Sequence, residues 1–75
     1  MQMMNEKQVL AFEHFGAELA KDYWRIMRKR MRPSGVVSVL VRTGNSKTKG
    51  ERFHFYDIDM DGGIELVSEH SPRQP

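Results

Sequence analysis

The stretch from Lys21 to Gly35 contains six basic residues and one acidic residue, in a chain whose net charge is only +2. Arginine and lysine side chains bind phosphate oxygens, so a dense basic run is typical of a nucleic-acid contact. A solvated face that suits the negative end of a helix dipole is the simpler alternative. If the run binds phosphates, we expect the contact to be made by the following residues, the last two from a flexible loop: Arg25, Arg28, Lys29, Arg30, Arg32, Lys47 and Lys49.

A second group of residues that could bind a ligand is acidic and extends from Asp57 to Glu65. Its acidic oxygens at alternate positions, followed by Gly62, resemble the opening of an EF-hand calcium loop. The resemblance fails at the twelfth position counted from Asp57, where Ser68 replaces the bidentate glutamate. In addition, the residues before Asp57 have a strand pattern, whereas an EF-hand has a helix there. We therefore interpret the segment as an Asp-Gly hairpin turn and keep weak Ca²⁺ binding by Asp57, Asp59 and Asp61 as the alternative.

No other residues form a catalytic or metal-binding pattern. The chain has no cysteine, and the three histidines lack the spacing of metal ligands. A domain of 75 residues rarely encloses the roughly 300 Å³ that a small-molecule site needs. We therefore expect no enzymatic activity, no cofactor, no metal and no small-molecule substrate.

The residues that must position these groups begin with a predicted helix over residues 5–32. Asn5 is suited to cap the helix and to form a capping box with Gln8. The helix must end before Pro33, because a residue that precedes proline is pushed out of the helical region. Apolar residues recur at helical spacing through this span and form one stripe: Phe12, Phe15, Leu19, Tyr23, Ile26 and Met27.

Three strands are predicted after the helix, over residues 36–42, 51–58 and 64–69, with a loose tail at 70–75. A five-residue turn at 59–63 would pair Ile58 with Ile64 and Tyr56 with Leu66, and Phe55 with Val67 on the other face. The same register sets two like charges opposite each other, which is unfavourable unless a cation lies between them. That charged pair is Asp57 and Glu65.

The predicted fold class is α+β, with one long helix packed on one face of a three-stranded antiparallel sheet. Phe53 and Phe55 are expected beneath the helix. The opposite face would then be open and half apolar, suited to stacking bases or to a protein partner or a second copy of the chain. Residues expected on this open face are Val36, Leu40, Tyr56, Ile58 and Val67.

The composition predicts one small domain. The hydrophobic content is 39% and the charged content 29%, as in ordinary globular proteins. The longest apolar run, Val39 to Val41, is far shorter than the roughly 20 residues that span a bilayer, so we expect no membrane association and a cytoplasmic location. The prediction is a small non-enzymatic binding or regulatory module, for nucleic acid or alternatively for a protein partner.

Overall fold

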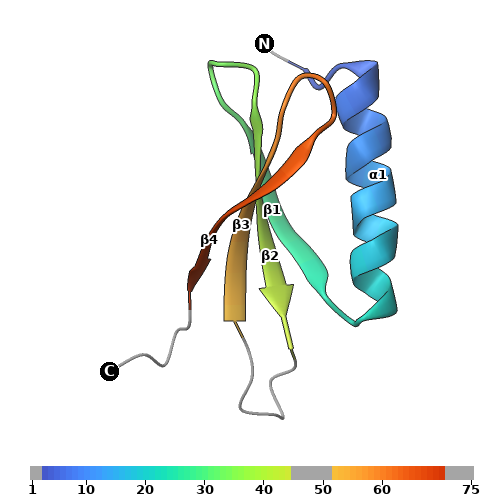
Figure 1. The fold of residues 1–75 in the computed structure, drawn as a ribbon, viewed down its shortest axis with the longest axis vertical. Coiled ribbons are helices and arrows are strands. Elements are labelled where there is room, and N and C mark those ends of the chain that lie inside the picture. The colour runs from blue at the N-terminus through green and yellow to red at the C-terminus, as the bar shows by residue number, and fades with distance from the viewer. Residues whose placement is uncertain (1–2, 45–51, 71–75) are drawn as a thin grey trace.

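The computed structural model describes residues 3–44 and 52–70 and contains one helix followed by four strands (Figure 1). This confirms the α+β class and the order of a helix followed by a β-meander, but the sheet has one strand more than predicted. The elements are α1 Glu6–Lys21, β1 Arg25–Met31, β2 Val37–Thr43, β3 Arg52–Ile58 and β4 Ile64–His70.

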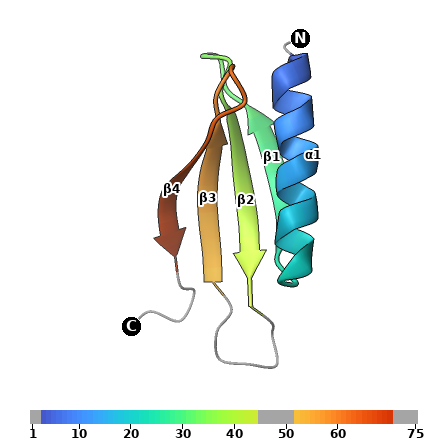
Figure 2. The same ribbon diagram turned by 45° about the vertical axis from the view of Figure 1, so that its right-hand side comes forward.

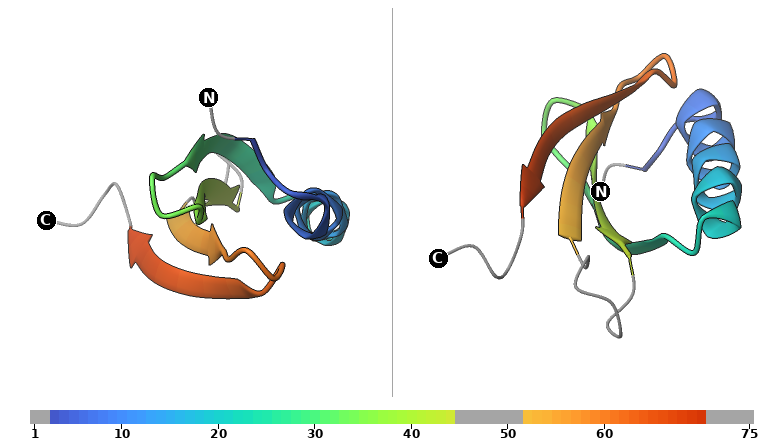
Figure 3. Two further views of the ribbon diagram at one scale, coloured as in Figure 1. Left: turned by 90° about the horizontal axis from the view of Figure 1, so that it is seen from above. Right: turned by 60° about the horizontal axis from the view of Figure 1, so that its bottom comes forward.

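The four strands form one antiparallel sheet in the order β1-β2-β3-β4, so β1 and β4 are its edges (Figure 2). Helix α1 lies along one face of the sheet and contacts β1 and β3. Seen from above, the sheet is strongly twisted and the helix stands on one side of it (Figure 3). No element formed by residues 3–44 and 52–70 covers the other side, which we call the open face.

The N-terminus of α1 is held by the capping box that the sequence predicts. The backbone N–H of Gln8 donates to Asn5 Oδ1 at 2.8 Å, and Gln8 Oε1 accepts from the backbone N–H of Asn5 at 3.1 Å. The Gln8 side chain continues inward, and its Nε2 donates to the carbonyl oxygens of Gly35 and Ile58. The first turn of the helix is thereby attached to the turn that joins β1 to β2 and to the last residue of β3.

The predicted helix is wrong in its second half, because α1 ends at Lys21 and the chain turns back into β1. The turn is a Schellman motif, in which the N–H of Tyr23 donates to Ala20 O and the N–H of Trp24 donates to Leu19 O. Glycine usually occupies the left-handed position of this motif, but here Tyr23 does, with a φ of +64°. Because no glycine stands at this position, the sequence lacks the usual sign of a helix end.

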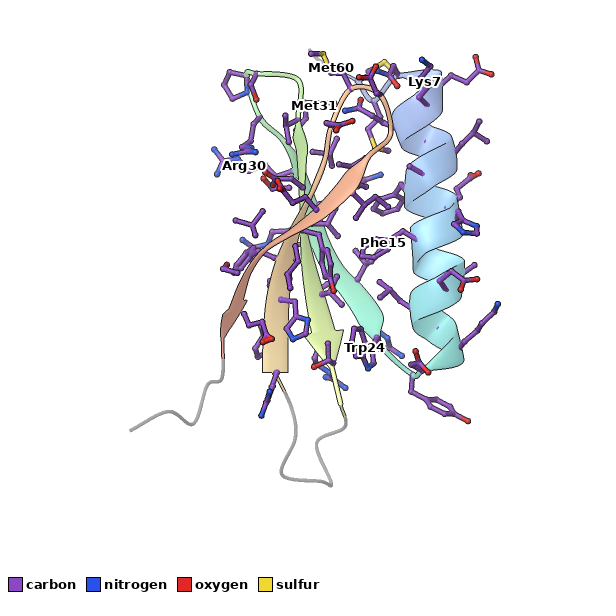
Figure 4. The ribbon with its side chains drawn as sticks, viewed as in Figure 1. Lys7, Phe15, Trp24, Arg30, Met31 and Met60 are labelled. Atoms are coloured by element: carbon purple, nitrogen blue, oxygen red, sulfur yellow. The ribbon has the colours of Figure 1, made fainter. Side chains whose placement is uncertain are left out.

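Between α1 and the sheet lies a small core in which valines from alternate β2 positions meet β3 and the helix. Alternation along β2 sends these valines inward and Ser38, Leu40 and Arg42 outward. The partly buried side chains around the core include Phe15 and Trp24, which point into the space between α1 and the sheet (Figure 4). The buried hydrophobic members of the core are Leu19, Val37, Val39, Val41 and Ile58.

The two faces of β3 are the reverse of those predicted. His54, Tyr56 and Ile58 pair with the core valines of β2 and face the helix, whereas Phe53 and Phe55 pair with Arg42 and Leu40 on the open face. Both alternating sets are largely apolar, so hydrophobicity alone does not choose between them. The register against Val37, Val39 and Val41 decides, because those side chains complete the core.

The predicted register of the last hairpin is confirmed for three pairs: Ile58 with Ile64, Tyr56 with Leu66, and Asp57 with Glu65. The fourth is wrong, because a register shift follows and Phe55 pairs with Ser68 rather than Val67. Val67 is the extra residue of this β-bulge, and its side chain is 55% exposed.

Candidate nucleic-acid interface

The strand register places basic and apolar side chains in cross-strand rows on the open face. The first residue of each row comes from the edge strand β1, the second from β2 and the third from β3. The three rows are Arg25–Arg42–Phe53, Arg28–Leu40–Phe55 and Arg30–Ser38–Asp57.

The middle of these rows forms a shallow depression of about 280 Å³. Leu40 and Phe55 give it apolar walls, and Phe55 keeps 38% of its surface exposed. Arg28 and Arg30 line its β1 side, both are exposed, and Arg30 projects away from α1 (Figure 4). The depression therefore offers an exposed aromatic ring beside two guanidinium groups, an arrangement that suits a planar group bearing negative charge.

Arg32 and Asp57 form an ion pair at the end of the open face. Arg32 Nη2 donates to Asp57 Oδ2 at 2.6 Å, and both side chains are partly exposed. Arg32 thereby supplies a positive charge to Asp57, one member of the like-charged Asp57–Glu65 pair. The pair partly neutralises this end of the face, so the positive charge is concentrated on the rows that begin with Arg25 and Arg28.

The basic residues predicted to act together do not all share this surface. Lys29 lies on the helix side of the sheet, where its Nζ is 4.8 Å from the centroid of the Phe12 ring in a cation–π contact. Lys47 and Lys49 lie outside the described residues. The arginines of the predicted set remain together because they occupy the open-face positions of β1 and the turn after it: Arg25, Arg28, Arg30 and Arg32.

Three residues of the open face are absent from the predicted site, namely Arg42, Phe53 and Phe55. The alternation of Ser38, Leu40 and Arg42 with buried valines was a usable sign for Arg42. No comparable sign existed for the two phenylalanines, since their strand is apolar on both faces.

The five residues predicted as a partner-binding surface are dispersed. Leu40 is on the open face, but Tyr56 faces the helix and Ile58 is fully buried. Val36 is half-buried in the turn before β2, and Val67 is at the bulge of β4. The prediction that these residues share one face is wrong.

In the acidic hairpin turn, the carboxylate of Asp59 accepts hydrogen bonds from within the turn itself. Asp59 Oδ1 accepts hydrogen bonds from the backbone N–H groups of Asp61 and Gly63, at 2.9 and 2.8 Å. Asp57 is engaged by Arg32. Within residues 3–44 and 52–70 there is no group of three side chains that could hold a metal ion. The interpretation of the segment as a hairpin turn is confirmed.

On the helix side of the sheet, His54 of β3 lies close to Glu69 of β4. His54 is buried, its ring meets Trp24 edge-on, and its Nε2 lies 3.7 Å from Glu69 Oε2. Beside it, burial raises the pKa of the Tyr56 hydroxyl, and the negative charge of Glu69 raises it further. These residues pack beneath the helix end and are not part of the open face.

Comparison with known proteins gave no match to any family model, any curated protein or any solved structure. The functional argument therefore depends on the geometry of the open face. In the part of the chain that the structure describes, α1 is neither long enough nor apolar enough to cross a membrane.

Proposed function

We propose that this chain is a small non-enzymatic, cytoplasmic module that binds single-stranded nucleic acid on its open face. The observation that carries the proposal is the row structure of that face, in which arginines of the edge strand β1 lie across from Leu40, Phe53 and Phe55. Sequence-tolerant single-strand binding combines a positively charged track for the phosphates with aromatic rings on which bases stack.

In this arrangement the sugar–phosphate backbone follows the β1 edge, and Arg28 and Arg30 bind phosphate oxygens. The bases extend inward across β2 and stack on the rings of Phe53 and Phe55. A duplex hides the faces of its bases in its own stack, so the half-buried ring of Phe53 and the exposed ring of Phe55 favour a single strand. The depression beside Phe55 accommodates one planar base.

A protein partner or a second copy of the chain is the other candidate occupant of this face. A second copy that docks with β1 against β1 is disfavoured, because its arginine rows would meet those of the first. Like-charge contact across an interface is unfavourable. A polyanion instead gains from each arginine, because every neutralised phosphate releases a counterion.

The test is fluorescence anisotropy with a labelled oligothymidylate of about 12 nucleotides and with a duplex of equal length, at about 0.05 M and about 0.2 M salt. We expect the single strand to bind more tightly than the duplex. Arg28→Glu should weaken single-strand binding about tenfold and flatten its salt dependence, since it removes one phosphate contact and adds a repulsive charge.

The matched control is Lys7→Glu, which makes the same charge change on the exposed surface of α1, near its N-terminus (Figure 4). This variant should bind nearly as well as the wild type. Equal losses in Arg28→Glu and Lys7→Glu would mean that only net charge matters, and the open face would lose its role. Absence of binding at low salt would reject nucleic acid as the ligand.

A further inference from the structure

A wide, open surface depression of about 510 Å³, which we call the cleft, lies where the chain leaves α1 and enters β1. Gly16, which has no side chain, and Ala20 form its helix side. The remaining walls come from the turn and the adjoining ends of β1 and β2: Tyr23, Trp24, Arg25, Ile26, Arg42 and Gly44.

Tyr23 is the unusual member of this cleft. Its φ of +64° is a conformation that a side chain disfavours, and the ring is 88% exposed, so core packing does not compensate. Glycine would form the same Schellman turn at lower cost. Neither the backbone nor the core accounts for a tyrosine here, and strained residues of this kind are concentrated at functional sites.

Arg25 and Arg42 connect the cleft to the open face. They stand directly opposite each other on β1 and β2, in the row that also contains Phe53. Like charges in this relation destabilise a sheet. The same two residues line the cleft, so a strand that follows the arginines of the open face is led to Tyr23.

We propose that this cleft is a further nucleotide subsite, in which the next base of the bound strand stacks on Tyr23 and its phosphate lies between Arg25 and Arg42. The subsite extends the function proposed above and depends on it. It also extends the path of the strand along β1, from the Arg30 row toward the end of the helix.

Trp24 is a built-in reporter for this site. It is the only tryptophan in the chain. It lines the cleft, while its ring is anchored edge-on against His54 at 5.5 Å between ring centroids. A nucleotide that enters the subsite therefore changes the Trp24 fluorescence, whereas a strand confined to Leu40, Phe53 and Phe55 does not.

The deciding experiment measures thermal stability, anisotropy with the labelled oligothymidylate and Trp24 fluorescence for three variants. Tyr23→Gly should raise Tm by about 4 °C, because it relieves the left-handed tyrosine, and should weaken binding at least about fivefold, because a stacking ring is lost. Tyr23→Asn, which also tolerates this backbone conformation, should bind as weakly as Tyr23→Gly. Tyr23→Phe keeps the ring and should bind like the wild type.

A more stable protein with weaker binding cannot be explained by damage to the fold, so the two readouts together identify the ring as a contact. If Tyr23→Gly binds at full strength, or if the oligonucleotide leaves Trp24 fluorescence unchanged, the subsite is rejected. The function proposed for the open face would still stand if Arg28→Glu weakens binding in the same assay. If neither variant weakens binding, both proposals fail.

Discussion

Tyr56 shows how burial of a single residue makes stability depend on pH. Its ring meets Phe15 edge-on with the centroids 4.8 Å apart, and burial, helped by Glu69, raises the pKa of its hydroxyl above the ordinary value of 10.0. The folded protein therefore holds this proton more tightly than the unfolded chain does. The resulting stabilisation is complete below pH 10 and is lost as the pH rises through the folded-state pKa.

We expect Tyr56→Phe to reduce the loss of stability in alkaline solution. The urea midpoint of the wild type should fall between about pH 8 and about pH 11. The fall should be smaller in the variant, which keeps the ring contact but has no hydroxyl to ionise. Tyr23→Phe, at an exposed position, is the control and should follow the wild type. Equal slopes in all three proteins would show that ionisation of Tyr56 does not limit alkaline stability.

At the scale of elements, α1 is attached to the sheet through the side chain of Gln8. This residue is 1% exposed, and its Nε2 donates to two carbonyl oxygens, that of Gly35 in the β1–β2 turn and that of Ile58 at the end of β3. Burying a polar side chain is tolerated only where its hydrogen bonds are made. The start of the helix is therefore joined to both hairpins by a buried side chain, in addition to the exposed hydrogen bond from Asn5 Nδ2 to Met60 O and the apolar contacts farther along α1.

Gln8→Leu should destabilise the protein by about 2–3 kcal/mol, because the carbonyl oxygens it leaves behind lose a buried donor. Asn5→Ala, which removes the cap and the exposed hydrogen bond from Asn5 Nδ2 to Met60 O, should cost about 1 kcal/mol. Urea unfolding of both variants measures the difference. If the two substitutions lower the free energy of unfolding equally, the hydrogen bonds from Gln8 to the carbonyl oxygens of Gly35 and Ile58 add nothing beyond the capping box.

The sequence was sufficient for the start of α1, the meander and most of the last register, because capping residues, turn residues and alternating patterns are local signals. The end of α1 was not predictable in the same way. Tyr23, Ile26 and Met27 continue the apolar period past a turn that only the left-handed Tyr23 makes possible. One sign against a longer helix was present, since Arg30 would have lain within the apolar stripe.

The candidate site was predictable only as a concentration of arginines. Which arginines act together depends on whether residues 25–31 are helical or extended, since a strand divides Lys29 from Arg28 and Arg30. The aromatic half of the site depends on the face that Phe53 and Phe55 occupy. That face is decided by contacts with β2 across the sheet, and no local pattern encodes them.

At the scale of the whole molecule, charge is separated between the two edges of the sheet. The β1 edge carries Arg25, Arg28 and Arg30, whereas β4 carries the exposed Glu65 and Glu69. Two of the basic residues, Arg25 and Arg42, face each other directly across β1 and β2. The fold therefore tolerates an unfavourable concentration of charge on the side that we propose binds phosphates.

We expect Arg25→Thr to stabilise the protein by about 0.5 kcal/mol at low salt, because it removes a like-charge cross-strand pair. The gain should shrink as salt screens the repulsion. Arg30→Thr is the matched control, since the same change on the same strand faces the neutral Ser38. Urea midpoints at two salt concentrations test this. If both substitutions raise the stability equally, the gain comes from the strand preference of threonine and not from the loss of repulsion.

The separation of charge between β1 and β4 also has a kinetic consequence. It gives the molecule an electric dipole moment directed across the sheet. The field of a polyanion exerts a torque on this dipole before any contact is made. The protein is turned so that its arginine edge leads, which increases the fraction of collisions that are productive. Added salt should therefore slow the capture of a strand more than it shortens the lifetime of the complex.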